Sequence, residues 1–142
     1  MSEKGQAPMI SHTFAIAFTI TIILFIVMSF NNIRDDYKAF ALENQISGIC
    51  DTIKGAIEKI YWPFDYESNG TFGRVIIDLP ERIGDTNYRA RFFDSSLLIE
   101  SEINSTCNIG FNITYAGSTT GGRTEIEWTR SGGVDKITMR RL

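Results

Sequence analysis

The sequence predicts an α+β protein: a long N-terminal hydrophobic helix continues into an amphipathic helix and is followed by a small antiparallel β-sheet or β-sandwich domain. Three observations carry this prediction. None of the residues from Gly5 to Ile33 is charged, although the chain of 142 residues is of ordinary composition. The next stretch spaces its apolar residues three and four apart, which is typical of an amphipathic helix. From Phe72 onward the spacing becomes two, as in β-strands. The expected segments are a hydrophobic helix over 6–30, an amphipathic helix over 31–62 and an antiparallel β domain over 72–142.

The uncharged segment is long enough to cross a membrane. As a helix, the 24 residues from Ala7 to Phe30 would rise about 36 Å, more than the roughly 30 Å of a hydrocarbon core. A buried core helix is the first alternative, but a β domain of only about 70 residues is too small to surround such a segment. A cleaved secretory signal peptide is the second, and it would have a shorter apolar region followed by a small-x-small cleavage site. The run ends instead in Val-Met-Ser-Phe-Asn-Asn, so we expect the helix to be retained.

The amphipathic stretch predicts a helix that docks on the protein's own sheet. Gly48 and Gly55 weaken this helix by roughly 1 kcal/mol each relative to alanine, and Pro63 is expected to end it. A coiled coil is the alternative, but the apolar steps drift too much for a regular heptad. The apolar stripe consists of Ile33, Tyr37, Phe40, Ile46, Ile49 or Cys50, Ile53, Ile57 and Ile60.

The β domain is predicted to be an antiparallel meander, because short turns separate the candidate strands. The glycine-rich stretch Gly117–Gly122 is interpreted as a hairpin loop, since no Lys-Ser/Thr pair or helical pattern follows it, as a phosphate-binding loop would require. The predicted strands are Arg74–Leu79, Tyr88–Phe93, Leu97–Ile103, Ile109–Tyr115, Thr124–Arg130 and Val134–Arg140.

Three N-x-S/T sequons, at Asn69, Asn104 and Asn112, all lie in the C-terminal part of the chain. Their clustering favours a glycosylated domain at the cell surface. Asn69 and Asn104 are expected in loops. Asn112 is expected on the outer face of its strand, because side chains alternate between the two faces of a sheet.

The two cysteines lie in different predicted elements. Cys50 belongs to the amphipathic helix, and Cys107 to the loop before the fourth predicted strand. Outside the cell these residues could form a disulfide that fastens the helix to the sheet. Two unpaired buried thiols are the alternative, which the sequence alone leaves open.

Composition disfavours several classes of function. The net charge of −3 and a pI near 5.1 argue against a nucleic-acid-binding protein, which would carry a basic patch. His12 is the single histidine, so a zinc or iron site is not expected. The acidic residues Asp78, Glu81 and Asp85 are interpreted as a solvated turn. We therefore expect no enzymatic activity, no cofactor and no metal.

A Lys-Gly pair stands directly before the charge-free segment. In this position it resembles the class III signal peptide of archaeal filament subunits, which prepilin peptidase cuts after the glycine. The resemblance implies a leader of residues 1–5 and cleavage between Gly5 and Gln6. The fifth mature residue would be Ile10, where bacterial type IV pilins usually carry glutamate and archaeal subunits often do not. An uncleaved anchor with a short cytoplasmic stub is the alternative.

The segment from Val75 to Ala90 carries a second resemblance. Its order of a strand, Leu-Pro-x-x-Ile-Gly and a strand led by Tyr88 is similar to a pattern in archaeal pilin-like surface proteins. Pro80 would end one strand, Gly84 would permit the reversal and Tyr88 would begin the returning strand. The domain layout as a whole is also pilin-like.

Together these resemblances imply a structural subunit of an extracellular archaeal type IV pilus-like filament. Its implied partners are membrane lipid before assembly, prepilin peptidase, an assembly ATPase with its membrane platform, and copies of itself. The alternative is a membrane-anchored β-sandwich binding module, such as an archaellum stator or a minor pilin that contacts the surface layer. In the filament the helices would pack through core residues that include Phe14, Phe18, Ile22 and Phe25.

Overall fold

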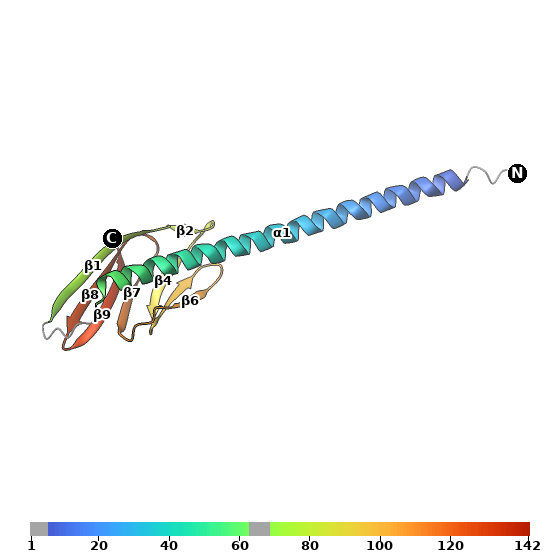
Figure 1. The fold of residues 1–142 in the computed structure, drawn as a ribbon. Coiled ribbons are helices and arrows are strands. Elements are labelled where there is room, and N and C mark those ends of the chain that lie inside the picture. Colours follow the sequence, from blue (N-terminus) through green and yellow to red (C-terminus); the bar gives the residue numbers. More distant parts are fainter. Residues whose placement is uncertain (1–5, 63–68) are drawn as a thin grey trace. The chain divides into compact units, whose positions relative to one another are not determined.

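The computed structural model describes residues 6–62 and 69–142, with side chains described from His12 onward. One helix, α1 (Gln6–Ile60), precedes the strands (Figure 1). The chain divides into two compact units, Met1–Phe40 and Ala41–Leu142. The α+β class and the two predicted helical segments are confirmed. The helix ends two residues earlier than expected, with the Tyr61 N–H donating to the Ile57 carbonyl at 2.8 Å. Pro63, the expected terminator, lies outside the described residues.

The second unit contains a seven-stranded sheet and a separate two-stranded hairpin among the residues that the structure describes. The sheet has the order β1-β8-β9-β7-β4-β5-β6, so β1 and β6 are its edge strands (Figure 1). The hairpin pairs β2 (Arg82–Ile83) with β3 (Thr86–Asn87). The sheet strands are β1 (Gly70–Leu79), β4 (Arg89–Phe93), β5 (Ser96–Glu100), β6 (Ser105–Asn108), β7 (Thr114–Thr119), β8 (Gly122–Ser131) and β9 (Val134–Arg141).

The predicted antiparallel meander is wrong. The first strand, β1, pairs with β8, and β7 pairs with β9 in parallel, while the other pairs in the sheet are antiparallel. The β8–β9 hairpin is therefore inserted between β1 and β7. Strands β1 and β8 each have ten residues and pair along nearly their whole length, from Gly70 opposite Arg130 to Leu79 opposite Gly122. This extended register outweighs the short connections on which the meander prediction was based.

Strand boundaries in the middle of the domain also differ from the prediction. Residues 109–113 are not in a strand, although they alternate in burial, and β7 begins only at Thr114. The stretch predicted as a loop, Gly117–Gly122, instead contributes residues to β7 and β8. The predicted strand Leu97–Ile103 stops at Glu100. Strand β6 was not predicted, because its sequence Ser-Thr-Cys-Asn lacks the apolar alternation that marks a strand.

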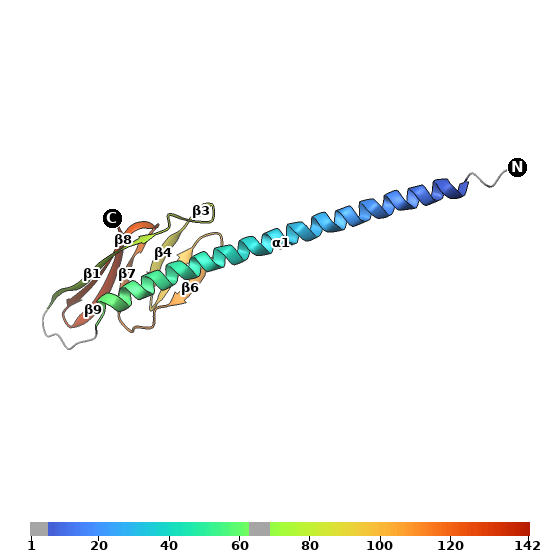
Figure 2. The same cartoon turned by 45° about the horizontal axis from the view of Figure 1, so that its top comes forward.

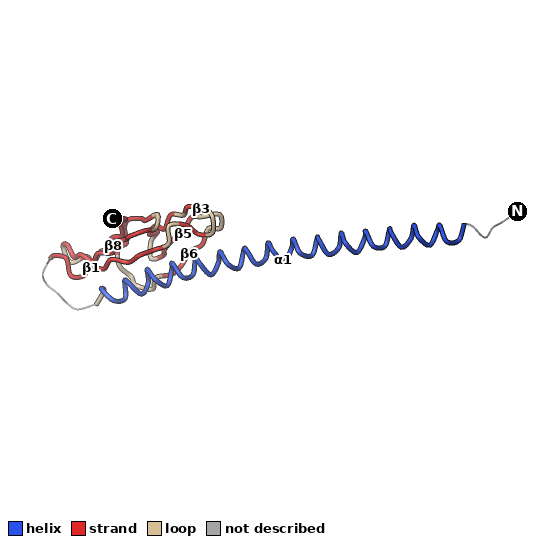
Figure 3. Tube along the Cα trace, turned by 90° about the horizontal axis from the view of Figure 1, so that it is seen from above, coloured by secondary structure: helices blue, strands red, loops and turns tan. Residues whose placement is uncertain are grey.

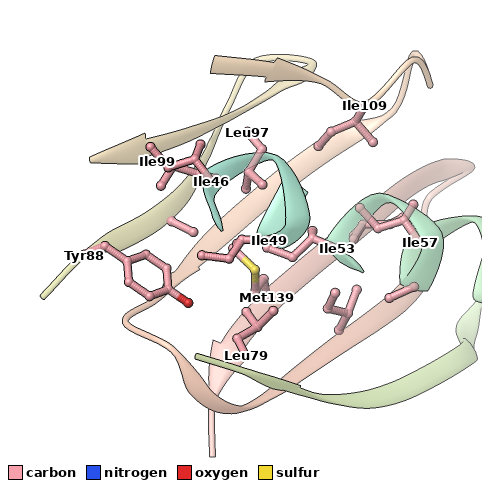
Figure 4. Packing of buried hydrophobic residues seen from close by; sticks show 14 of the residues in the cluster. Ile46, Ile49, Ile53, Ile57, Leu79, Tyr88, Leu97, Ile99, Ile109 and Met139 are labelled. Atoms are coloured by element: carbon pink, nitrogen blue, oxygen red, sulfur yellow. The ribbon is translucent and has the colours of Figure 1, made fainter. Parts of the chain in front are cut away.

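The core lies between the last turns of α1 and one face of the sheet (Figures 1 and 3). Figure 4 shows the isoleucines of α1 turned toward side chains of the strands. Burying an isoleucine side chain contributes about 1.5–3 kcal/mol, so these contacts account for the docking of this part of the helix. The buried apolar residues of these elements are Ile46, Ile49, Ile53, Ala56 and Ile57 from α1, with Leu79, Ala90, Leu97, Ile99, Ile126, Trp128, Ile137 and Met139 from the sheet.

The predicted docking stripe is thus confirmed only in its second part. Ile33, Tyr37 and Phe40 are 63%, 72% and 62% exposed. These residues belong to the first compact unit, which lies before the part of α1 that packs on the sheet. The apolar spacing of three and four residues therefore begins before the part of the helix that docks on the sheet.

The turn predicted after β1 forms a hairpin of its own. Pro80 follows the end of β1, and Gly84 has a φ of 59° between β2 and β3. Strand β3 of this hairpin is labelled in Figure 2. The Gly84 N–H donates to Oε1 of Gln45 on α1 at 2.8 Å. Strand β4 begins after Tyr88 and pairs with β5 and β7 instead of returning along β1. The chain reverses as predicted, but the strands before and after the reversal, β1 and β4, are not neighbours in the sheet.

Candidate functional site

The surface of α1 is apolar and uncovered from His12 to Ile33. Every side chain from residue 12 to residue 38 is exposed. The four predicted filament-core residues follow this pattern, with Phe14, Phe18, Ile22 and Phe25 at 73%, 69%, 44% and 74% exposure. Within the part of the chain that the structure describes, α1 is the one helix long and apolar enough to span a membrane.

Two threonine hydroxyls of this segment are satisfied within the helix. The Thr19 hydroxyl donates to the Ala15 carbonyl at 2.8 Å, and the Thr21 hydroxyl to the Ala17 carbonyl at 2.9 Å. Such bonds let threonine lie in an apolar environment without an unpaired donor. The helix therefore presents a surface suited to lipid or to the apolar face of another helix.

The predicted cleavage site lies at the boundary of the described residues. Gly5 is outside them, and Gln6 is the first residue of α1. If the leader is cut where predicted, the mature chain begins at the first helical residue that the structure describes.

All three sequon asparagines are exposed. Asn69 and Asn104 lie outside strands, as predicted. Asn112 was expected within a strand, and it lies instead in the loop before β7. The Oδ1 atom of Asn69 accepts a hydrogen bond from the Gly132 N–H at 2.9 Å. Each asparagine is therefore on the surface of the β domain.

Cys50 on α1 and Cys107 on β6 are joined by a disulfide, with 6.3 Å between their Cα atoms. Cys107 was expected in a loop and lies in an edge strand. The bond fastens the docked part of the helix to the edge of the sheet opposite β1.

A buried carboxylate that sequence reasoning missed lies between two arginines. The Glu125 side chain is only 4% exposed and pairs with Arg74 on β1, at 2.9 Å, and with Arg140 on β9. Ion pairs to both neighbouring strands compensate the burial of this charge. The register places Glu125 opposite Ile76 on one side and Arg140 on the other. In the sequence, Glu125 stands between Thr124 and Ile126. A glutamate on the exposed face of a strand has the same kind of neighbours, so the sequence does not distinguish it as buried.

A second polar group fastens the β8–β9 hairpin. Arg130 donates to both carboxylate oxygens of Asp135 at 2.8 Å, and the Trp128 indole N–H donates to Oδ1 at 3.1 Å. The Arg130 hydrogen bonds lower the pKa of Asp135, and burial opposes them. The Trp128 ring is also 5.2 Å from the Tyr61 ring, centroid to centroid. Through Trp128, the Arg130–Asp135 ion pair is therefore connected to Tyr61, directly after the end of α1.

Asp135→Asn is expected to destabilise the domain by about 1–3 kcal/mol at pH 7, because it removes charged hydrogen bonds from partly buried groups. A carboxyl whose folded pKa is lowered stabilises the fold above its unfolded pKa, near 3.9, and this contribution is lost as the pH falls through the folded pKa. Thermal unfolding of both proteins from pH 7 to pH 2 measures this. The difference in unfolding temperature between the wild type and Asp135→Asn should become smaller below a pH of about 4. A gap that does not change with pH would contradict an ionised, arginine-paired Asp135.

Other polar side chains among the described residues are the remaining candidates for a metal or ligand site. Within residues 12–62 and 69–142, no three His, Cys, Asp or Glu side chains are placed to hold a metal ion. A groove near the disulfide, of about 480 Å³, is open to solvent and is lined by Glu43, Ser47, Asn104 and Thr106 among others. Asp78 and Glu81 are exposed beside the end of β1. No family model matches the chain, and neither does a curated protein or a solved structure.

Proposed function

We propose that this protein is a structural subunit of an extracellular, archaeal type IV pilus-like filament. The observation that carries the proposal is the uncovered apolar surface of α1 over residues 12–33, in a helix whose last turns are docked on a β domain. In this proposal the helices form the filament core and the β domains cover its outside. The chain contributes surfaces for assembly and needs no catalytic group.

The energetics of assembly support packing through this helix. Before assembly its side chains would contact lipid, and in the filament they would contact other helices, so they stay out of water in both states. The driving force is then close packing and dispersion between helices. Phe14, Phe18 and Phe25 are large side chains at spacings of four and seven residues, which places them on the same side of the helix. They are the residues on which we expect this packing to depend most.

The N-terminus and intact mass of protein shed from cells in filaments test this proposal. An N-terminus at Gln6 with added sugar mass would support a processed and glycosylated filament subunit. Protein that begins at Met1 and occurs only in membranes would contradict it and would support a membrane-anchored binding module instead.

Gly5→Asp is expected to block maturation and to abolish filaments, because a charged side chain replaces the flexible glycine at the proposed cleavage site. Electron microscopy of cell surfaces and the N-terminal sequence of the membrane fraction measure both effects. Gly5→Ala is the matched control and should retain at least part of the processing, since alanine adds a single methyl group without charge. Normal filaments from the Gly5→Asp variant would refute the cleavage step.

A further inference from the structure

The seven-stranded sheet is open at both sides. Strands β1 and β6 each pair with a single neighbour among the described residues, β8 for the first and β5 for the second (Figure 1). An edge strand presents unpaired N–H and C=O groups, which can pair with a strand of another molecule. In a filament, many copies of the domain would be held close together, so these edges would meet often.

Two of the three sequons lie at these two edges. Asn69 immediately precedes β1, and Asn104 immediately precedes β6. The third, Asn112, precedes β7, which is an interior strand with β9 on one side and β4 on the other. The threonines that complete the three sequons, Thr71, Thr106 and Thr114, are exposed and lie in β1, β6 and β7.

The hydrogen bond described for the exposed Asn69 side chain uses Oδ1, whereas a sugar is attached through Nδ2. Transfer forms a bond between Nδ2 and the anomeric carbon of the sugar and breaks the bond from that carbon to the phosphate of a lipid-linked oligosaccharide donor, while Nδ2 loses one proton. Oδ1 is not consumed, so its hydrogen bond from Gly132 can persist and orient the amide. The sugar would then be attached at the residue immediately before β1.

The protein's own protection of these edges is partial. Strand β1 has a bulge between Thr71 and Gly73 and carries the charged Arg74 and Asp78, features that discourage edge pairing. Between those charges, Ile76 is 46% exposed. Strand β6 is short, with four residues. A bulky solvated group at the start of each strand would complete the protection.

We propose that sugars on Asn69 and Asn104 shield the two edges of the sheet and so prevent edge-to-edge pairing of β domains, whereas a sugar on Asn112 has no such effect. This inference rests on the proposed extracellular, glycosylated subunit. It assigns a specific purpose to two of the three sequons.

Matched threonine substitutions in the full-length chain test the proposal. Thr71→Ala with Thr106→Ala removes both edge sequons and leaves the asparagines in place, while Thr114→Ala removes the interior one. Each protein is made in cells that glycosylate N-x-S/T sequons and purified in detergent. Intact mass gives sugar occupancy, circular dichroism checks the fold, and thioflavin fluorescence with sedimentation measures β-aggregation. We expect the double variant to aggregate at least five-fold more than the wild type, with Thr114→Ala unchanged.

Two further measurements separate edge shielding from other effects. Made in bacterial cells that attach no sugar, the wild type and the double variant should aggregate equally, since the substitutions themselves are not the cause. Ile76→Lys in the double variant should reduce aggregation, because a lysine on an edge strand discourages pairing.

Equal aggregation of the double variant and Thr114→Ala, or no increase in the double variant, would overturn the proposal. Wild-type protein without sugar on Asn69 and Asn104 would also overturn it. In that case an N-terminus at Gln6 would still support the filament subunit, so the two proposals fail separately.

Discussion

Gly117→Ala is expected to prevent the β domain from folding. Gly117 lies in β7 opposite Met139 of β9, with a φ of 100°. A Cβ atom at this position would collide with the carbonyl oxygen of Met139. Because the obstacle is the backbone of a paired strand, it cannot move without breaking the parallel β7–β9 pairing. Combined strain and lost pairing should exceed about 4 kcal/mol, a large part of the stability of a typical domain.

Gly110→Ala is the matched control for this substitution. Gly110 also has a positive φ, of 85°, but a Cβ atom there would meet no other atom within 4 Å. Its cost should be limited to the backbone strain of about 1–2 kcal/mol. Thermal unfolding followed by circular dichroism compares the two variants in detergent. Similar transition temperatures for both would show that β7 and β9 do not approach as closely as the structure has them.

Removal of the disulfide is the second change with a large expected effect. Cys50→Ala with Cys107→Ala opens a loop whose ends are 57 residues apart. In the chain-entropy description, a loop of this length corresponds to about 4 kcal/mol of lost stability. The docked isoleucines of α1 remain, so we expect the domain to fold with a much lower unfolding temperature.

A reducing agent provides the control for this experiment. It should lower the unfolding temperature of the wild type to near that of the double variant, and it should leave the variant unchanged. The disulfide would be contradicted if the unfolding temperature of the wild type stayed the same after treatment with the reducing agent under denaturing conditions, which expose the bond. Mass spectrometry before and after alkylation of free thiols identifies the two cysteines directly.

The helix and its division into two kinds of surface could be predicted from the sequence. The absence of charge up to Ile33 and the spacing from Ile46 to Ile57 are local signals, because residues three and four apart lie on the same side of a helix. The exposure of the sequons was also predicted, for Asn69 and Asn104 from their loops and for Asn112 from the alternation of its neighbours. Most strand positions were also predicted, since alternation is a property of consecutive residues.

The partners of those strands could not be predicted in this way. Strand β1 pairs with β8 across the length of the domain, and its alternation fits any strand with a complementary apolar face. Strand β6 has almost no apolar residues and is held by its pairing with β5 and by the Cys50–Cys107 disulfide. The apolar alternation from Ile109 to Ile113 is real in burial, but the segment has no strand partner among the described residues, so it is a loop.

The consequence for function is clearest at the glycosylation sequons. The sequence alone determined that Asn69, Asn104 and Asn112 are candidate acceptors, because the motif consists of adjacent residues. Only the tertiary structure decided that the first two stand at the edges of the sheet and the third beside an interior strand. An edge is defined by which strand has no neighbour, and neighbours in a sheet are chosen by contacts between residues that are distant in the chain.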